Sequence, residues 1–204
     1  MSATEDLLTA LPSDPAAERR LRDRLVAEAE RTGLLDVAYR NIDSPVGPLL
    51  LAASEAGLLK VAFAAVEDRD QVLASLAARI SPRLLHAPAR LDGAARELGE
   101  YFAGHRTAFE LPLDLRLAHG FRRTVLDHLR RVDYGSTTTY AALAAQAGSP
   151  RAVRATGSAC ATNPLPLVVP CHRVLRSDGT VGQYAGGAEV KQALLRLESS
   201  TMVT

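Results

Sequence analysis

The chain has 204 residues, of which 47% are hydrophobic and 23% charged, and its formal net charge is +1. These values are ordinary for a globular protein and argue against a disordered chain. The longest apolar runs are far shorter than the roughly 18 residues that cross a bilayer, and the N-terminus is acidic rather than basic as in a secretory signal. We therefore expect a protein of the cytoplasm, nucleoid-associated if the source is bacterial, with no membrane partner.

Residues 1–36 predict an appended helix. Asp14-Pro15 is typical of an N-cap followed by a first-turn proline, and Gly33 is typical of a helix end. Apolar residues at a spacing of four share one face, and arginines crowd the rest. An arginine cluster can bind nucleic acid, but here it is interleaved with acidic residues, which favours a solvated face. We expect this helix to be accessory to the protein's function.

The next part of the chain, residues 37–116, predicts a small antiparallel meander followed by helices. Three short apolar segments are separated by breakers that contain proline or glycine, and they predict strands over 37–43, 48–53 and 58–64. The remaining periodicity predicts two helices and one strand, over 67–80, 91–103 and 107–111. This part contains few residues suited to catalysis.

Residues 117–204 predict a mostly helical region. One helix is expected over 121–132, a second capped by Thr137–Thr139 and reaching Ala147, and a third from a Ser149-Pro150 cap to about Cys160. Two short helices joined by a glycine-containing turn suggest a helix-turn-helix. This region holds ten basic and five acidic side chains, a balance that suits phosphate contact or an ordinary solvated surface.

Three prolines within seven residues exclude a regular helix over 163–173 and predict a stiff, extended loop there. The Ser177-Asp178-Gly179-Thr180 sequence predicts a hairpin turn. A final amphipathic helix is expected over 188–198.

Cys171 follows Pro170 directly and precedes His172 directly. A thiol reacts as its thiolate, and an unperturbed pKa of about 8.5 leaves little thiolate at neutral pH without a base. His172 is a candidate base, although sequence neighbours rarely face each other without an irregular turn or a bridging water. On these residues alone, a buried and inert cysteine beside an incidental histidine remains an open alternative.

The Pro170-Cys171-His172-Arg173-Val174 run, preceded by Asn163-Pro164 and followed by Gly186-Gly187, resembles the active-site signature of the O6-alkylguanine–DNA alkyltransferases. These proteins are also called methylated-DNA–protein-cysteine methyltransferases. The resemblance extends over about residues 37–198. It implies an α+β fold with a small antiparallel sheet-plus-helix N-terminal domain and a mostly helical C-terminal domain with a helix-turn-helix. The implied domains are an N-terminal helical extension, a ribonuclease-H-like α/β domain and a DNA-binding and alkyl-transfer domain, over 1–36, 37–116 and 117–204.

The resemblance implies DNA repair by a single-use, stoichiometric and irreversible reaction without a cofactor. The partner is double-stranded DNA containing O6-alkylguanine, whose damaged base is flipped out of the stack so that its alkyl group moves to Cys171. By resemblance, His172 activates Cys171 through a water and Glu198 orients the imidazole. The hydroxyl of Tyr140 supplies a proton to the departing guanine.

Further residues are implied to contact DNA or the flipped base. Arg154 would fill the space left by the base, Asn163 would tie together the turns around the cysteine, and Tyr184-Ala185 would form the lip of the base pocket. The implied contacts also include Val174, Ser149, Arg151 and Thr156. Animal relatives carry a zinc site in the N-terminal half, but this chain has no cysteine before Cys160, and we expect no metal.

Two other functions are compatible with parts of the sequence. A non-catalytic module that binds alkylated bases would not need Cys171, and a cysteine hydrolase would leave Arg154 without a role. We expect a monomer, with cooperative binding on DNA left open.

Overall fold

The computed structural model describes residues 14–201. The chain divides into two compact units, residues 1–35 and residues 36–204. In the first unit, α2 (Pro15–Arg31) begins after Asp14, whose side chain accepts hydrogen bonds from the backbone of Ala16 and Ala17. The chain leaves the helix through Gly33 at φ +66°. The predicted helix and its cap are confirmed.

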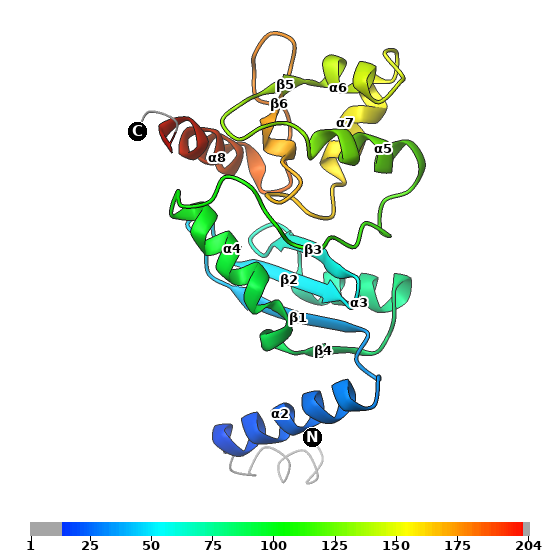
Figure 1. The fold of residues 1–204 in the computed structure, drawn as a ribbon, viewed down its shortest axis with the longest axis vertical. Coiled ribbons are helices and arrows are strands. Elements are labelled where there is room, and N and C mark those ends of the chain that lie inside the picture. Colours follow the sequence, from blue (N-terminus) through cyan, green and yellow to red (C-terminus); the bar gives the residue numbers. More distant parts are fainter. Residues whose placement is uncertain (1–13, 202–204) are drawn as a thin grey trace, which may run out of the picture. The chain divides into compact units, whose positions relative to one another are not determined.

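The second unit contains an open four-stranded sheet in the order β3-β2-β1-β4 (Figure 1). Strands β1 (Val37–Ile42), β2 (Leu49–Ser54) and β3 (Gly57–Phe63) form the antiparallel meander that the sequence predicts. Strand β4 (Leu84–His86) adds to β1 in parallel. Every residue of β2 is buried, as expected of a strand covered on both faces.

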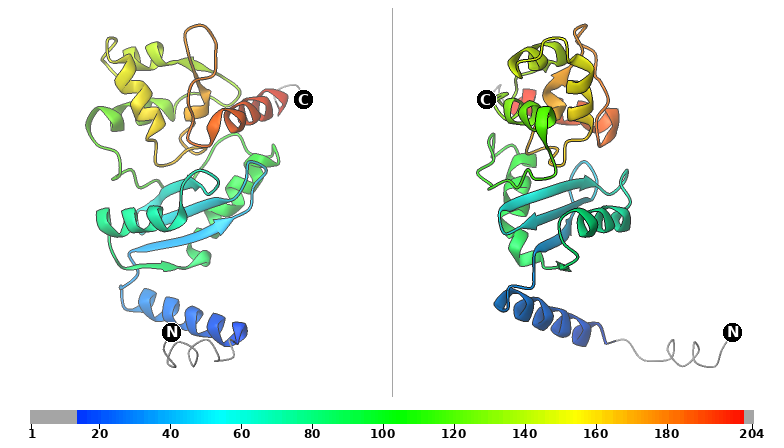
Figure 2. Two further views of the ribbon diagram at one scale, coloured as in Figure 1. Left: turned by 180° about the vertical axis from the view of Figure 1, so that it is seen from behind. Right: turned by 90° about the vertical axis from the view of Figure 1, so that its right-hand side faces the viewer.

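Two helices cover opposite faces of this sheet, α3 (Arg69–Arg79) and α4 (Asp92–Phe102) (Figure 2). A short 3₁₀ helix, η1 (Pro88–Leu91), leads into α4. Apolar side chains of the strands and α3 form one buried cluster that includes Leu50, Leu59 and Leu76. We call residues 36–116 the sheet region.

Residues 117–201, the helical region, contain four α-helices and a small parallel ladder. The helices are α5 (Gly120–Leu129), α6 (Tyr140–Gln146), α7 (Val153–Ala161) and α8 (Gly187–Thr201). Strands β5 (Thr138–Thr139) and β6 (Val174–Leu175) pair in parallel, and the 3₁₀ helix η2 (Cys171–Arg173) directly precedes β6. The protein therefore has an α+β fold. No helix among residues 14–201 is long and apolar enough to span a bilayer.

The expected strand over 107–111 is wrong. The backbone N–H of Glu110 donates to the Glu97 carboxylate, and Pro112 has no N–H to add to a ladder. The pairing with β3 falls instead at an isolated bridge between Leu58 and Leu113. The sequence prediction also missed β4, a strand of only three residues.

Two local predictions in the helical region are also wrong. Helix α7 begins at Val153 without a side-chain cap. Ser149 lies in the turn before it, where its backbone carbonyl accepts from the Ala152 N–H at 2.8 Å. The segment 163–170 is not extended but tightly turned. Leu167 has a φ of +75°, and the Val169 N–H donates to the Leu165 carbonyl at 2.8 Å.

Candidate active site

The turn that carries Cys171 is built by a proline and a 3₁₀ helix. Pro170 precedes η2, and the backbone N–H of Cys171 donates back to the Val169 carbonyl at 2.8 Å. The cysteine is 2% exposed and His172 is fully buried. The irregular turn that a neighbouring Cys-His pair requires is therefore present, and it holds both side chains inside the protein.

Asn163 ties this turn together with its buried amide. Its Nδ2 donates to the Val169 carbonyl at 2.8 Å and to Cys171 Sγ at 3.2 Å. Its Oδ1 accepts from the Leu165 N–H at 3.0 Å. One amide thus fixes the backbone on both sides of the turn and also contacts the sulfur.

The sulfur is protonated in this enclosed state. Burial raises the pKa of Cys171 to about 11, and the Asn163 hydrogen bond and the charge of Lys191 oppose the rise only in part. Lys191 on α8 is itself fully buried, and its Nζ donates to the Val174 carbonyl at 2.5 Å. A base is needed before this thiol can attack at neutral pH.

The base candidate is held by a carboxylate from α8. His172 Nε2 lies 2.7 Å from Glu198 Oε1, and both groups are buried. Burial alone would raise the pKa of Glu198, but hydrogen bonds from His172 and Arg173 lower it to about 2. Glu198 is therefore ionised, and a carboxylate without a proton requires His172 to carry its proton on Nε2.

The other imidazole nitrogen is left as an acceptor. Burial lowers the pKa of His172, and the Glu198 hydrogen bond opposes this only in part. The ring is thus neutral with a lone pair on Nδ1, and this atom has no hydrogen-bond partner within residues 14–201. A buried base without a partner, on the residue that follows a protonated thiol, can accept that thiol's proton through one water.

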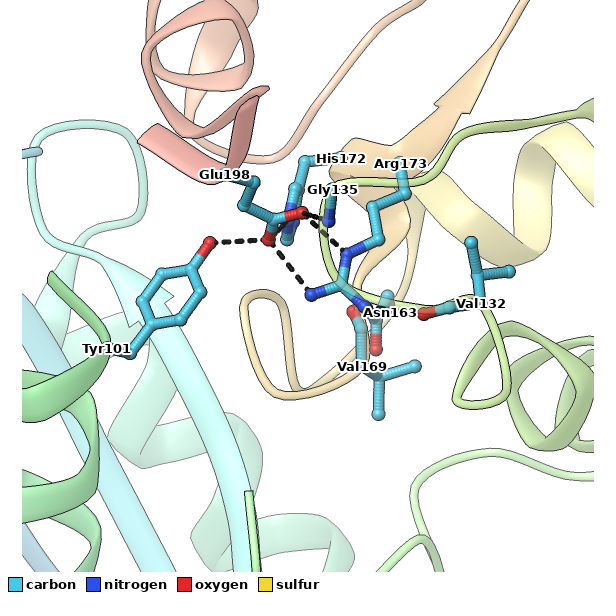
Figure 3. A network of polar contacts seen from close by, with 8 residues as sticks. All are labelled: Tyr101, Val132, Gly135, Asn163, Val169, His172, Arg173 and Glu198. Carbon is cyan, nitrogen blue, oxygen red and sulfur yellow. Dashed lines mark hydrogen bonds and ion pairs between the residues drawn. The ribbon is translucent and has the colours of Figure 1, made fainter. Parts of the chain in front are cut away.

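Three further groups bind the same carboxylate (Figure 3). Arg173 donates from Nε to Oε2 at 2.8 Å and from Nη2 to Oε1 at 2.9 Å. The Gly135 N–H donates to Oε2 at 3.2 Å, and the Tyr101 hydroxyl donates to Oε1 at 2.8 Å. Glu198 is therefore saturated with donors, two of which come from elements far from it in sequence.

Tyr140 stands at the first position of α6, directly after β5. The pairing of β5 with β6 places it beside the strand that follows the Cys171 turn. Its phenol is half-buried, and burial raises its pKa. Gly182 faces the phenol so closely that a Cβ there would lie 2.6 Å from the Tyr140 hydroxyl. The hydroxyl is thus protonated and able to donate.

The segment 183–187 contributes lining residues to two cavities. A cavity of about 490 Å³ is lined by Gln183, Tyr184, Ala185 and Gly187 of this segment, together with residues that include Arg176 and Gly182. A second cavity of about 650 Å³ is lined by Ala185, by Asn163 and by residues of α3. The Tyr184 ring packs edge-on against Phe63 of β3, with 5.6 Å between centroids. The predicted lip therefore borders open space and rests on the sheet region.

The side chains of Arg151 and Arg154 are exposed at α7 and the turn before it. The guanidinium of Arg154 has no hydrogen-bond or ion-pair partner within residues 14–201, so it is free to meet a ligand. Ser149 is half-buried in the turn. The expectation that Thr156 shares this surface is wrong, because Thr156 is fully buried and its hydroxyl donates to the Ala152 carbonyl.

Sequence reasoning missed three residues of the site. Arg173 lies inside the recognised motif but received no role, although its buried guanidinium binds Glu198. Lys191 looks like any lysine of an amphipathic helix. Tyr101 looks like a core aromatic of α4, and its contact with Glu198 spans 97 positions of sequence. Within residues 14–201, no group of His, Cys, Asp or Glu side chains is placed to hold a metal ion.

Comparison with known proteins agrees with this geometry. The family model described as 6-O-methylguanine DNA methyltransferase, DNA binding domain, matches residues 120–200. The model described as 6-O-methylguanine DNA methyltransferase, ribonuclease-like domain, matches residues 37–115.

Individual proteins similar to this chain are named as methylated-DNA–protein-cysteine methyltransferases. The methylated-DNA–protein-cysteine methyltransferase of Mycobacterium tuberculosis H37Rv is 39% identical over 167 residues, covering 80% of this chain and 93% of the relative. The constitutive enzyme of Bacillus subtilis is 35% identical over 163 residues, covering 78% and 94%. A crystal structure of M. tuberculosis OGT in complex with DNA superposes with a TM-score of 0.70 at 38% identity, covering 80% and 94%. The chain therefore belongs to the 6-O-methylguanine DNA methyltransferase family, whose members repair DNA by moving the alkyl group to a cysteine of their own.

Proposed function

We propose that this protein removes the alkyl group from O6-alkylguanine in duplex DNA once per molecule, with Cys171 as the permanent acceptor. The observation that carries the proposal is the buried Glu198–His172 pair. Its histidine has an unpartnered acceptor, Nδ1, and directly follows Cys171, whose thiol is protonated. A thioether is a stable product, and nothing in this site is suited to cleave it. After one alkyl transfer, Cys171 has no free thiol, and the molecule cannot accept a second alkyl group.

The proposed reaction balances its protons among three side chains. His172 Nδ1 accepts the Cys171 proton through a water, and the sulfur attacks the alkyl carbon as the carbon–O6 bond breaks. The electron pair of that bond stays with guanine, which takes a proton from the Tyr140 hydroxyl. Return of the His172 proton to the Tyr140 phenolate restores both residues. The net result is a thioether on Cys171 and a guanine that carries the proton lost by the thiol.

The burial of the sulfur supports base flipping as part of the proposed reaction. Cys171 is 2% exposed, so an alkyl group inside a stacked duplex has no path to it. The base would enter beside the 183–187 segment, which lines parts of two cavities. The exposed guanidinium of Arg154 supports its role as the group that replaces the base in the stack, since a planar cation stacks on bases. Arg151 and Ser149 would contact the backbone nearby, as in a helix-turn-helix docked on DNA.

Stoichiometry distinguishes this function from turnover by a hydrolase. The protein is mixed with an excess of duplex that contains one O6-methylguanine, and the remaining lesion is measured over hours. We expect consumption to stop at one lesion per protein molecule, and Cys171→Ser to consume none while still binding the duplex. Continued consumption beyond one equivalent would contradict the proposal. A size measurement in the same samples tests the expected monomer.

A further inference from the structure

The Glu198 carboxylate of the helical region receives a hydrogen bond from the sheet region. The Tyr101 hydroxyl, on α4, donates to Oε1 at 2.8 Å. The same oxygen accepts from His172 at 2.7 Å. Figure 3 shows the phenol approaching the carboxylate from the side opposite Arg173. Tyr101 and His172 thus share one acceptor oxygen, and His172 is the candidate base for Cys171.

Packing leaves the phenol little freedom. Tyr101 is fully buried. Its ring lies edge-on to Tyr134 with 6.1 Å between centroids and is tilted on Phe109 at 5.4 Å. Burial and the Glu198 charge both raise its pKa far above the ordinary value. The hydroxyl therefore stays protonated at every working pH and remains a donor aimed at one oxygen.

We propose that Tyr101 is a positioning residue for alkyl transfer, whose hydroxyl holds the Glu198 carboxylate in the orientation that presents His172 Nδ1 to Cys171. The inference rests on the proposed function of the Glu198–His172 pair. A carboxylate with two oxygens can rotate, and Tyr101 is the donor to Oε1 that is independent of both Arg173 and His172. Groups that hydrogen-bond to the carboxylate partner of a histidine help to orient the imidazole and tune its basicity.

The hydroxyl also limits how strongly Glu198 acts on His172. Among residues 14–201, the charged groups that act on the imidazole are Glu198, Arg173 and Lys191. Tyr101 and Tyr184 add neutral dipoles nearby. Loss of the Tyr101 donor leaves more of the carboxylate's charge uncompensated, which favours the protonated imidazole. A protonated His172 cannot accept a proton, so the acid side of the rate profile should move to higher pH.

The test is the single-turnover rate of alkyl transfer at saturating duplex, measured across a range of pH. Tyr101→Phe keeps the ring and removes the hydroxyl, and we expect a rate lower by roughly 10-fold with duplex affinity unchanged. Its acid limb should shift to higher pH, and NMR of the His172 ring should show the same shift independently of the rate. Tyr39→Phe removes a hydroxyl that contacts Arg69 in the sheet region, and this control should transfer at the rate of the unaltered protein.

A double-variant cycle separates this inference from the proposed function. If Tyr101 acts through Glu198, adding Tyr101→Phe to Glu198→Gln should lower the rate far less than it does alone. An unchanged rate and pH profile in Tyr101→Phe, with Glu198→Gln slow, would overturn the inference and leave the proposed function standing. A fully additive loss in the double variant would overturn it as well. If Glu198→Gln transfers the alkyl group at the unaltered rate, the proposed role of the Glu198–His172 pair is wrong. The inference about Tyr101 is then wrong as well.

Discussion

The amide of Asn163 donates a hydrogen bond to Cys171 Sγ at 3.2 Å while it also holds the Val169 carbonyl at 2.8 Å. The contact to sulfur and the shape of the turn therefore depend on one side chain. A substitution at Asn163 should change both the stability of the protein and the reactivity of the thiol.

Asn163→Ala should leave the buried Leu165 N–H without its partner and leave the Val169 carbonyl with the Cys171 N–H as its donor. A buried polar group left unpaired costs about 1–3 kcal/mol, so we expect the free energy of unfolding to fall by roughly 1–3 kcal/mol. The transfer rate should fall too, because a thiolate without the Nδ2 donor is harder to form. Urea denaturation gives the first quantity and single-turnover kinetics the second. A variant as stable as the unaltered protein would show that the amide does not organise the turn.

The thiol should react slowly with small reagents at neutral pH when DNA is absent. Burial raises the pKa of Cys171 to about 11 and that of Cys160 to about 12. In a Cys160→Ser background, the rate of alkylation by iodoacetamide should rise about tenfold per pH unit between about pH 8 and 10, because it follows the thiolate fraction. A rate that levels off near pH 7 would instead indicate a preformed thiolate.

Stability should fall on acidification partly because of Glu198. The pKa of its carboxyl is about 2 in the folded protein, below the ordinary value. The stabilisation is therefore present above the ordinary glutamate pKa and is lost as the pH falls toward 2. Chemical denaturation between about pH 5 and 3 should show a steeper loss for the unaltered protein than for Glu198→Gln. If stability falls equally steeply with pH in both proteins, groups other than Glu198 cause the loss of stability in acid.

The position of Tyr140 can be tested without changing the tyrosine. A Cβ at Gly182 would lie 2.6 Å from its hydroxyl, so Gly182→Ala should displace the phenol and slow transfer by roughly 10-fold or more, a loss in the range of a misplaced general acid. Gly93→Ala is the matched control, because nothing lies within 4 Å of a Cβ there. Duplex binding should be retained by both variants. Equal rates would show that the phenol has room to move or has no part in transfer.

Local sequence patterns predicted much of the fold and the centre of the site. The alternation of breakers and apolar runs predicted β1, β2 and β3, and the Thr139 cap of α6 is present with its side chain accepting from Ala142. The segment before Cys171 was predicted as extended because proline restricts the helix. Its real shape depends on the Asn163 side chain, which satisfies backbone groups within the turn. Such side-chain-to-backbone bonds have no periodic signature.

The part of the site that sequence could not predict lies in tertiary contacts. Tyr101 occupies an apolar position of α4, and no local pattern distinguishes a tyrosine that packs from one that also donates across the protein. The burial of Thr156 is a similar case, since its place on α7 depends on which face the helix turns inward. Motifs name the residues that react, whereas packing decides which others hold them.

The most direct test of the central claim is peptide mass mapping after reaction with duplex that contains isotopically labelled O6-methylguanine. The account predicts one labelled methyl group per chain, located on Cys171 and absent from Cys160. Label on another residue, or more than one methyl group per chain, would contradict it.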